Sequence, residues 1–210
     1  MELKKINPQL RESLISLGLS EPTEMQSECF TLLKSGADCL IASPEGTGKT
    51  TLLAMSIIQQ LASPGEESPR ALVFVRDREA VLTFIEDFEK INTRNGLRIF
   101  GTHEKTNLDE DKNLISLGID VLVGTPVKLG ELFGTAGFNI NRLRIFAVDD
   151  AQLLMADRRE PHIMRISQSI ARVQRVIFTS VLTEKVEFFA DKLLDQDAPL
   201  IDFTQDEDIV

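Results

Sequence analysis

The chain has 210 residues, a net charge of −10, 42% hydrophobic residues and 27% charged residues, as in a globular protein with one sizeable core. No apolar run reaches membrane-spanning length and no apolar signal segment opens the chain, so we expect a cytoplasmic protein without membrane contacts. The acidic balance argues against strong autonomous binding of nucleic acid, because phosphate backbones attract basic surfaces, although it leaves room for a local basic face.

The few cysteines and histidines predict neither a disulfide nor a metal site. Cys29 and Cys39 lie in apolar surroundings without CxxC spacing, and we expect free, buried thiols there. His103 and His162 are isolated from each other and from the cysteines, so no zinc site is predicted.

Along the chain, a helical extension at 8–34 precedes apolar runs of strand length that alternate with helical patterns. The strand candidates are 38–42, 71–75, 97–100, 120–123, 143–148, 175–178 and 200–203. The clearest helical patterns cover 50–61, 78–91, 107–117 and 184–194. The continuous apolar runs suit a sheet covered on both faces, and the alternation implies right-handed βαβ units. We therefore predict an α/β fold with an open, mostly parallel sheet and helices on both faces.

No segment has the composition of a domain linker, so we predict one domain spanning 1–210. Within it, 1–36 is the helical extension, 37–204 the core, and 205–210 an acidic tail that is expected to fray.

The stretch SPEGTGKT at 43–50 follows the first expected strand and opens a helix. Gly46 and Gly48 allow the backbone to curl so that its N–H groups form an anion site, Lys49 can reach β- and γ-phosphates, and Thr50 can ligate Mg²⁺. Ser43 stands where the strict phosphate-loop pattern has its first glycine. A chance glycine turn is the weaker alternative. The predicted phosphate-binding residues are Glu45, Gly46, Thr47, Gly48, Lys49, Thr50 and Thr51.

About 100 residues later, FAVDDAQLL carries two acids at the end of an apolar strand. A phosphate loop needs an acid on a neighbouring strand to hold the water shell of Mg²⁺, and Asp149 is placed for that role. Asp150 could orient an attacking water. The alternative is that one of these acids caps the following helix.

The order of these segments resembles the first RecA-like domain of DEAD-box RNA helicases, over nearly the whole chain. The motifs that carry the resemblance are GLSEPTEMQ at 18–26 (Q motif), SPEGTGKT (motif I), VRDREA at 75–80 (Ia), GTPVKL at 124–129 (Ib), VDDAQ at 148–152 (II) and FTSVL at 178–182 (III). The resemblance implies a RecA-like P-loop NTPase fold with ATP and Mg²⁺ as cofactors. By the same match Gln26 reads the adenine edge, and Thr23 shapes the turn before it.

The resemblance also implies contacts with the RNA backbone. The matching residues are Arg76, Arg78, Gly101, Thr102, Thr125 and Lys128. Any RNA binding by this acidic chain should be weak and strongly salt-dependent. The alternative stays open that Arg76 and Arg78 form a solvated helix start and that Thr125 merely begins the next helix.

Several motifs depart from the family pattern. Motif II should read Asp-Glu-Ala-Asp, but Asp150 is one methylene shorter than the expected Glu, and Gln152 replaces the last Asp, which removes a charged link to motif III. A misplacement of about 1 Å can cost on the order of 100-fold in rate. No aromatic residue precedes Phe30, so the upstream aromatic that stacks on adenine is missing.

The sequence supports two functions that belong to different classes of protein. The first is an ATP- and RNA-binding helicase domain with Lys49, Asp149 and Asp150 in catalysis, whose hydrolysis and unwinding require a second RecA-like domain outside this chain. The second is a degenerate, non-catalytic helicase-like module that serves as a binding or regulatory partner. A small-molecule kinase is disfavoured because the sequence shows no basic lid.

Overall fold

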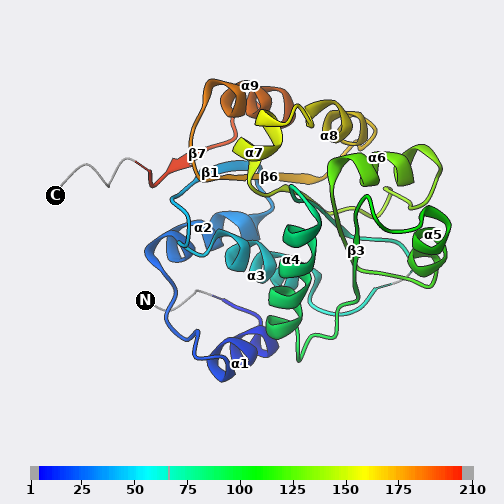
Figure 1. The fold of residues 1–210 in the computed structure, drawn as a ribbon. Coiled ribbons are helices and arrows are strands. Elements are labelled where there is room, and N and C mark those ends of the chain that lie inside the picture. The colour runs from blue at the N-terminus through cyan, green and yellow to red at the C-terminus, as the bar shows by residue number, and fades with distance from the viewer. Residues whose placement is uncertain (1–4, 66, 205–210) are drawn as a thin grey trace.

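Continuous apolar runs form the strands, and helices cover both faces of the resulting sheet (Figure 1). The computed structural model describes residues 5–65 and 67–204. The strands are β1 (Cys39–Ala42), β2 (Ala71–Phe74), β3 (Ile99–Thr102), β4 (Val121–Gly124), β5 (Ile145–Val148), β6 (Gln174–Thr179) and β7 (Leu200–Asp202). The helices are α1 (Pro8–Ser16), α2 (Glu24–Ser35), α3 (Lys49–Leu61), α4 (Arg78–Ile91), α5 (Leu108–Ser116), α6 (Pro126–Gly134), α7 (Ala151–Ala156), α8 (Glu160–Ser167) and α9 (Glu184–Leu193).

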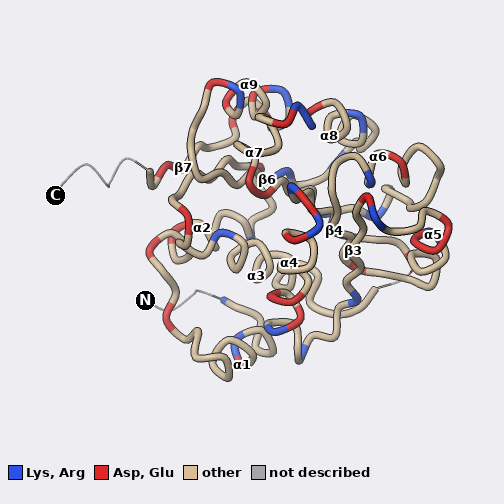
Figure 2. Tube along the Cα trace, in the orientation of Figure 1, with Lys and Arg blue, Asp and Glu red and all other residues tan. Residues whose placement is uncertain are grey.

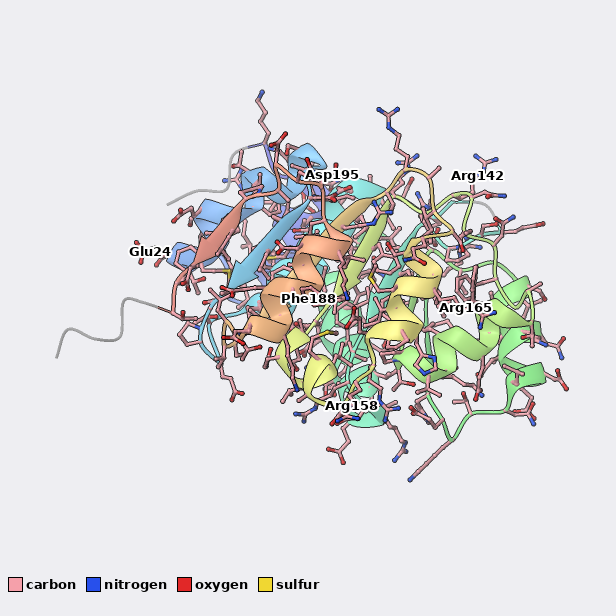
Figure 3. All side chains as sticks on the ribbon, turned by 90° about the horizontal axis from the view of Figure 1, so that it is seen from above. Glu24, Arg142, Arg158, Arg165, Phe188 and Asp195 are labelled. Atoms are coloured by element: carbon pink, nitrogen blue, oxygen red, sulfur yellow. The ribbon has the colours of Figure 1, made fainter. Side chains whose placement is uncertain are left out.

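The described residues form a seven-stranded sheet in the order β3-β4-β2-β5-β6-β1-β7, and every pair of neighbours is parallel. All carboxyl ends therefore lie along one edge, where ligands bind in open sheets of this kind. In the view from above, Arg142, which precedes β5, and Arg158, which follows α7, lie on opposite sides of the molecule (Figure 3). They mark the amino edge and the carboxyl edge of the sheet.

Alternate residues of each central strand enter two separate apolar cores. In β2, for example, Val73 joins the core beneath α1–α4, whereas Leu72 and Phe74 join the core beneath α6–α9. Figure 1 shows these two helix groups on opposite faces of the sheet. Both faces of the sheet are buried beneath helices, which explains why the strands are apolar without alternation. This arrangement confirms the predicted α/β fold class.

The N-terminal extension consists of two helices with a turn between them. Gly18 has φ of 74° in this turn. The next helix starts with a capping box, in which Thr23 and Gln26 exchange hydrogen bonds between side chain and backbone. Both α1 and α2 contribute to the core that also contains α3 and α4.

The structure differs from the sequence prediction in three short helices. The helices α6, α7 and α8 lie outside the helical ranges expected from the sequence, because elements of six to nine residues show few repeats of the 3.6-residue period.

Cys29 and Cys39 are free and buried, and burial raises the pKa of each thiol to about 12. The predicted acidic tail at 205–210 lies outside the described residues.

The described residues contain neither a membrane-spanning helix nor a cluster of potential metal ligands. None of their helices has both the length and the hydropathy needed to cross a membrane. None of their His, Cys, Asp and Glu side chains gather in groups of three or more that could hold a metal ion.

Candidate functional site

The loop between β1 and α3 curls around its two glycines. Gly46 and Gly48 have φ of 80° and 92°, a backbone conformation that favours glycine. Gly48 is also the N-cap of α3 and provides no side-chain cap, so the first N–H groups of the helix are left for another acceptor. A Cβ at Gly48 would lie 2.5 Å from Gln26 Nε2, so a side chain there would displace the Gln26 amide. The loop thus presents uncapped N–H groups beside α2, as the predicted anion site requires.

Ser43, the residue that departs from the strict pattern, is fully buried beneath this loop. Its hydroxyl donates to Thr47 Oγ1 at 2.8 Å, and that hydroxyl donates to the Pro44 carbonyl at 2.9 Å. Ser43 therefore braces the loop from below, where it takes no space from a phosphate.

Lys49 is buried at the start of α3 and turns back onto its own loop. Its Nζ donates to the carbonyls of Ser43 at 2.5 Å and Pro44 at 2.7 Å. Burial lowers the pKa of Lys49, while the charges of Asp149, Asp150 and the exposed Glu45 oppose that shift. The ammonium is held within the loop, and neutral carbonyls alone occupy its donors.

Thr50 and Asp149 meet across the carboxyl edge, although β6 lies between their strands. The Thr50 hydroxyl donates to Asp149 Oδ2 at 3.0 Å. Burial, followed by repulsion from Asp150, raises the pKa of Asp149 to about 6. The buried Asp149 carboxylate and the Thr50 hydroxyl together provide the hard oxygen donors that Mg²⁺ prefers. These two residues fit a magnesium ion that is otherwise held by phosphate oxygens and water.

Asp150 adopts a left-handed conformation with φ of 50° and ψ of 44°. It occupies the N-cap position of α7, but its side chain makes no capping hydrogen bond, so this structure does not support the capping alternative. Asp150 instead lines a cavity of about 520 Å³ together with Lys49, Thr50 and Asp149. Its carboxylate is available to a group bound in that cavity.

A second cavity, of about 620 Å³, lies on the other side of the glycine loop and is lined by both α1 and α2. Gln26 contributes to it; its Oε1 accepts from Thr23 N at 3.1 Å and its Nε2 donates to the Gly48 carbonyl at 3.3 Å. The Thr23 hydroxyl donates to the Thr47 carbonyl at 3.3 Å and so joins the turn to the phosphate loop. The aliphatic side chains of Ile15 and Leu19 line its wall.

The last residue of motif II links to motif III through a neutral amide. Gln152 Oε1 accepts from the Thr179 hydroxyl at 2.9 Å and from Ser180 N at 3.1 Å. The charge of an Asp is absent, as the sequence predicts, yet the connection between the ends of β5 and β6 is retained.

Arg76 and Arg78 lie at the start of α4, where both side chains are exposed. Arg76 Nε forms an ion pair with Asp77 at 2.9 Å, and Asp77 also caps the helix by accepting from Ala80 N. Burial lowers the pKa of His103, and the charge of Arg78 lowers it further. Basic and acidic positions alternate over this surface without an extended basic run (Figure 2). A role in RNA contact stays a prediction for these two arginines.

Gly101 has a packing role within β3. A Cβ there would lie 2.3 Å from Ile85 Cδ1 and 2.7 Å from Val81 Cγ1, so glycine allows the strand to approach α4. This requirement explains the residue type without a ligand.

The structure does not bring Thr102, Thr125 and Lys128 to the surface. Lys128 Nζ donates to the Thr106 carbonyl at 2.7 Å and lies 3.8 Å from Asp111 Oδ2. Thr102 donates to the same Asp111 oxygen at 2.6 Å. The interpretation that Thr125 begins a helix is supported, because it is the N-cap of α6. An RNA contact through the Lys128 side chain would require this buried cluster to open.

Some residues that line the two cavities were not among the site residues predicted from the sequence. Glu79, Thr83 and Ser180 line the cavity that contains Asp149, and Met55 lines the cavity next to Gln26. Met55 follows Thr51 by four residues on α3, so helical spacing could have indicated it. Ser180 lies within the motif III match at 178–182, but no local spacing connects it to the phosphate loop, because strand order places the end of β6 beside that loop.

Comparisons with known proteins agree with this arrangement. The family model "DEAD/DEAH box helicase" matches residues 23–189. Eukaryotic initiation factor 4A of Caenorhabditis elegans is 24% identical over 189 residues, which cover 89% of this chain and 46% of that protein. The probable ATP-dependent RNA helicase YfmL of Bacillus subtilis (strain 168) is 23% identical over 85% of this chain and 47% of its own length.

A rice relative, DEAD-box ATP-dependent RNA helicase 42 of Oryza sativa subsp. japonica, is 23% identical over 90% of this chain and 19% of its own length. The chain thus spans less than half the length of these curated relatives. Among solved structures, a variant of S. cerevisiae Dbp5 bound to Nup159, Gle1, IP6 and ADP superposes with a TM-score of 0.85. It is 18% identical, and the match covers 94% of this chain and 52% of that chain, so it shows a shared fold.

Proposed function

Because the chain belongs to the DEAD/DEAH box helicase family, we propose that it binds ATP, Mg²⁺ and RNA as one RecA-like domain of an RNA helicase-like protein. The observation that carries the proposal is the hydrogen bond between Thr50 and Asp149. It joins the end of the phosphate loop to the acid of motif II at the carboxyl edge of the sheet, where phosphoryl-transfer sites need both.

The two cavities beside the glycine loop divide the proposed nucleotide site. The phosphates would accept N–H groups of the loop and of the α3 N-terminus, and Lys49 would exchange its contacts with carbonyls for phosphate oxygens. The base would enter the cavity lined by Gln26, whose amide offers both a donor and an acceptor to the adenine edge. Aliphatic Ile15 and Leu19, in place of an aromatic ring, predict modest affinity.

Thr50 and Asp149 would hold Mg²⁺ at the outer phosphates. When bound, the ion neutralises developing charge on the transferred phosphoryl group. Asp149 would then have a directly bound cation in addition to the charge of Lys49, so metal binding should lower its pKa from about 6.

Asp150 would orient the attacking water, but its side chain is one methylene shorter than Glu. We therefore expect slow hydrolysis that requires a second RecA-like domain, which would supply cations from the opposite side of the nucleotide. Asp150→Glu should raise any measurable turnover in a steady-state phosphate-release assay. Unchanged turnover would show that Asp150 does not orient water.

Among the proposed ligands, RNA has the least support in the structure, because Lys128 is buried and Arg76 is paired with Asp77. The same observations, with the shortened Asp150, favour a second candidate: a non-catalytic module that binds nucleotide or protein partners. An RNA titration at two salt concentrations separates them. A helicase domain should bind single-stranded RNA weakly, with an affinity that falls as salt rises and with loss in Arg78→Gln.

The experiment that tests the proposal is calorimetric titration of ATP·Mg²⁺ and ADP·Mg²⁺ into the purified chain, which lacks the Trp and Tyr needed for intrinsic fluorescence. Lys49→Ala should abolish binding while circular dichroism stays unchanged, and Gln26→Ala should weaken it. Absence of binding at millimolar nucleotide would contradict the proposal.

A further inference from the structure

Ser180 lies at the carboxyl edge, between the phosphate loop and the acids of motif II. It follows the last residue of β6, and β6 lies between β1, which leads into the phosphate loop, and β5, which leads into Asp149 and Asp150. Ser43 N donates to the Thr179 carbonyl at 3.0 Å, so the base of the phosphate loop is bonded to the residue beside Ser180. Ser180 lines the same cavity as Lys49 and Asp149, so a group bound between these two residues lies in the cavity that Ser180 also lines.

The Ser180 hydroxyl is an unexplained polar group within the proposed site. The residue is 8% exposed and lines the cavity that also contains Lys49, Thr50, Asp149 and Asp150. Its Oγ is shielded from solvent and has no hydrogen-bond partner among the described residues. A buried hydroxyl without a partner lowers stability, and an individual case in a folded protein calls for an explanation.

Gln152 fixes the backbone of Ser180 and leaves its hydroxyl unengaged. The Gln152 Oε1 accepts from Ser180 N and from the neighbouring Thr179 hydroxyl. The backbone is thereby held while the serine side chain can rotate about one bond to meet an incoming acceptor. Gln152 is a positioning residue in this arrangement.

The charges around the cavity favour a neutral donor. Four carboxylates line it, from Glu45, Glu79, Asp149 and Asp150, against two cations, from Lys49 and Arg76. A terminal phosphate placed here meets repulsion, and a hydroxyl can donate to its oxygen without the desolvation cost of another charge.

We propose that the Ser180 hydroxyl donates a hydrogen bond to the terminal phosphate of a bound nucleoside triphosphate and so distinguishes triphosphate from diphosphate. The inference rests on the proposed nucleotide binding and deepens it. The partner would be the outer phosphate, because the curl of Gly46 and Gly48 would hold the inner ones, and Thr50 and Asp149 would hold the Mg²⁺ at the outer one. A diphosphate leaves the hydroxyl as it is in the free chain.

The test is calorimetric titration of a non-hydrolysable ATP analogue with Mg²⁺, and of ADP·Mg²⁺, into the wild-type chain and Ser180→Ala. We expect Ser180→Ala to weaken binding of the triphosphate by about tenfold and to leave ADP within about twofold, as for loss of one charge-assisted hydrogen bond. Ser180→Thr keeps the hydroxyl and should retain the preference. Ser56→Ala, which removes a buried hydroxyl from α3, is the matched control.

The outcomes separate the two proposals. If the wild-type chain binds both nucleotides and Ser180→Ala weakens them equally or not at all, the role of Ser180 is overturned and nucleotide binding stands. If the wild-type chain binds neither, both proposals fail. Thermal unfolding of the free variants adds a readout: a structural hydroxyl would make Ser180→Ala less stable, whereas an unpartnered one predicts equal or higher stability.

Discussion

Two buried aspartates at opposite edges of the sheet have opposite electrostatics. Asp120 precedes β4 at the amino edge and Asp149 follows β5 at the carboxyl edge, with exposed fractions of 0% and 6%. Burial alone would raise the pKa of Asp120, but hydrogen bonds from Arg98, Gly65 and Arg70 outweigh burial and hold it at about 2. Asp149 has no such guanidinium partner, and its pKa rises to about 6.

The difference separates a carboxylate that is paired within the protein from one that we propose binds a ligand. At the amino edge, the Asp120 carboxylate receives Arg70 Nη2 at 2.6 Å and Arg98 Nε at 2.9 Å, which join the starts of β2, β3 and β4. At the carboxyl edge, the Asp149 carboxylate accepts one hydrogen bond from a hydroxyl, that of Thr50, and lies beside a second acid, Asp150. An uncompensated buried charge costs stability, and such groups gather where a ligand will neutralise them.

The largest expected effect is at the amino edge. Asp120→Asn should lower the free energy of unfolding by about 3 kcal/mol, because the fully buried carboxylate is the shared charge partner of Arg70 and Arg98, whose side chains are 13% and 37% exposed. Urea unfolding at pH 7, followed by circular dichroism, measures it. Asp109→Asn, at a side chain that is 89% exposed, is the matched control and should change little. A loss below about 1 kcal/mol for Asp120→Asn would remove the contrast between the edges.

The opposite sign is expected at the carboxyl edge. Asp149→Asn should raise the free energy of unfolding by about 2 kcal/mol at pH 8, because it removes a charge that folding must desolvate beside Asp150. The same variant should lose Mg²⁺-dependent nucleotide binding. Paired urea unfolding and calorimetry measure both changes, and a destabilised Asp149→Asn would contradict the electrostatic account.

The pH dependence of stability should sharpen the comparison. Between about pH 4 and 6, folded Asp149 keeps a proton that the unfolded chain has lost, so stability falls as pH rises, by roughly 1 kcal/mol per pH unit. Asp120 acts in the opposite direction: its contribution is complete above about pH 4 and is lost as pH falls toward 2. Unfolding curves across pH 2–7 should lose the first slope in Asp149→Asn and the second in Asp120→Asn.

The smallest expected effects concern the loop glycines. Gly46→Ala and Gly48→Ala each place a side chain at positive φ and should cost about 1 kcal/mol in stability. Only Gly48→Ala should also displace Gln26, since no atom lies within 4 Å of a Cβ built at Gly46. If Gly48→Ala alone loses the preference for adenine over guanine, measured by competition calorimetry, the result would indicate that Gln26 recognises the base. Equal behaviour of the two variants would argue against Gln26.

Local patterns were sufficient for much of the fold. The apolar runs predicted every strand of the described sheet, and the pairing of strands with helices predicted the α/β class, because a sheet covered on both faces requires apolar residues at every position. The extents of the short helices α6–α8 could not be predicted, although the sequence offered helix starts after Thr125 and after the acids of motif II, since their helical conformation depends on packing against the sheet and each other.

The sequence by itself determined the local conformation of the glycine loop and the helix that follows it, because two glycines, a lysine and a threonine at fixed spacing act through the backbone they belong to. Only the tertiary structure decided the state of each charge. It buried Lys128 against Asp111, paired Asp120 with two arginines, and left Asp149 and the Ser180 hydroxyl without a full set of partners. The physical reason is that solvation and pairing depend on residues from distant strands, and strand order, which no local pattern encodes, brings those residues together.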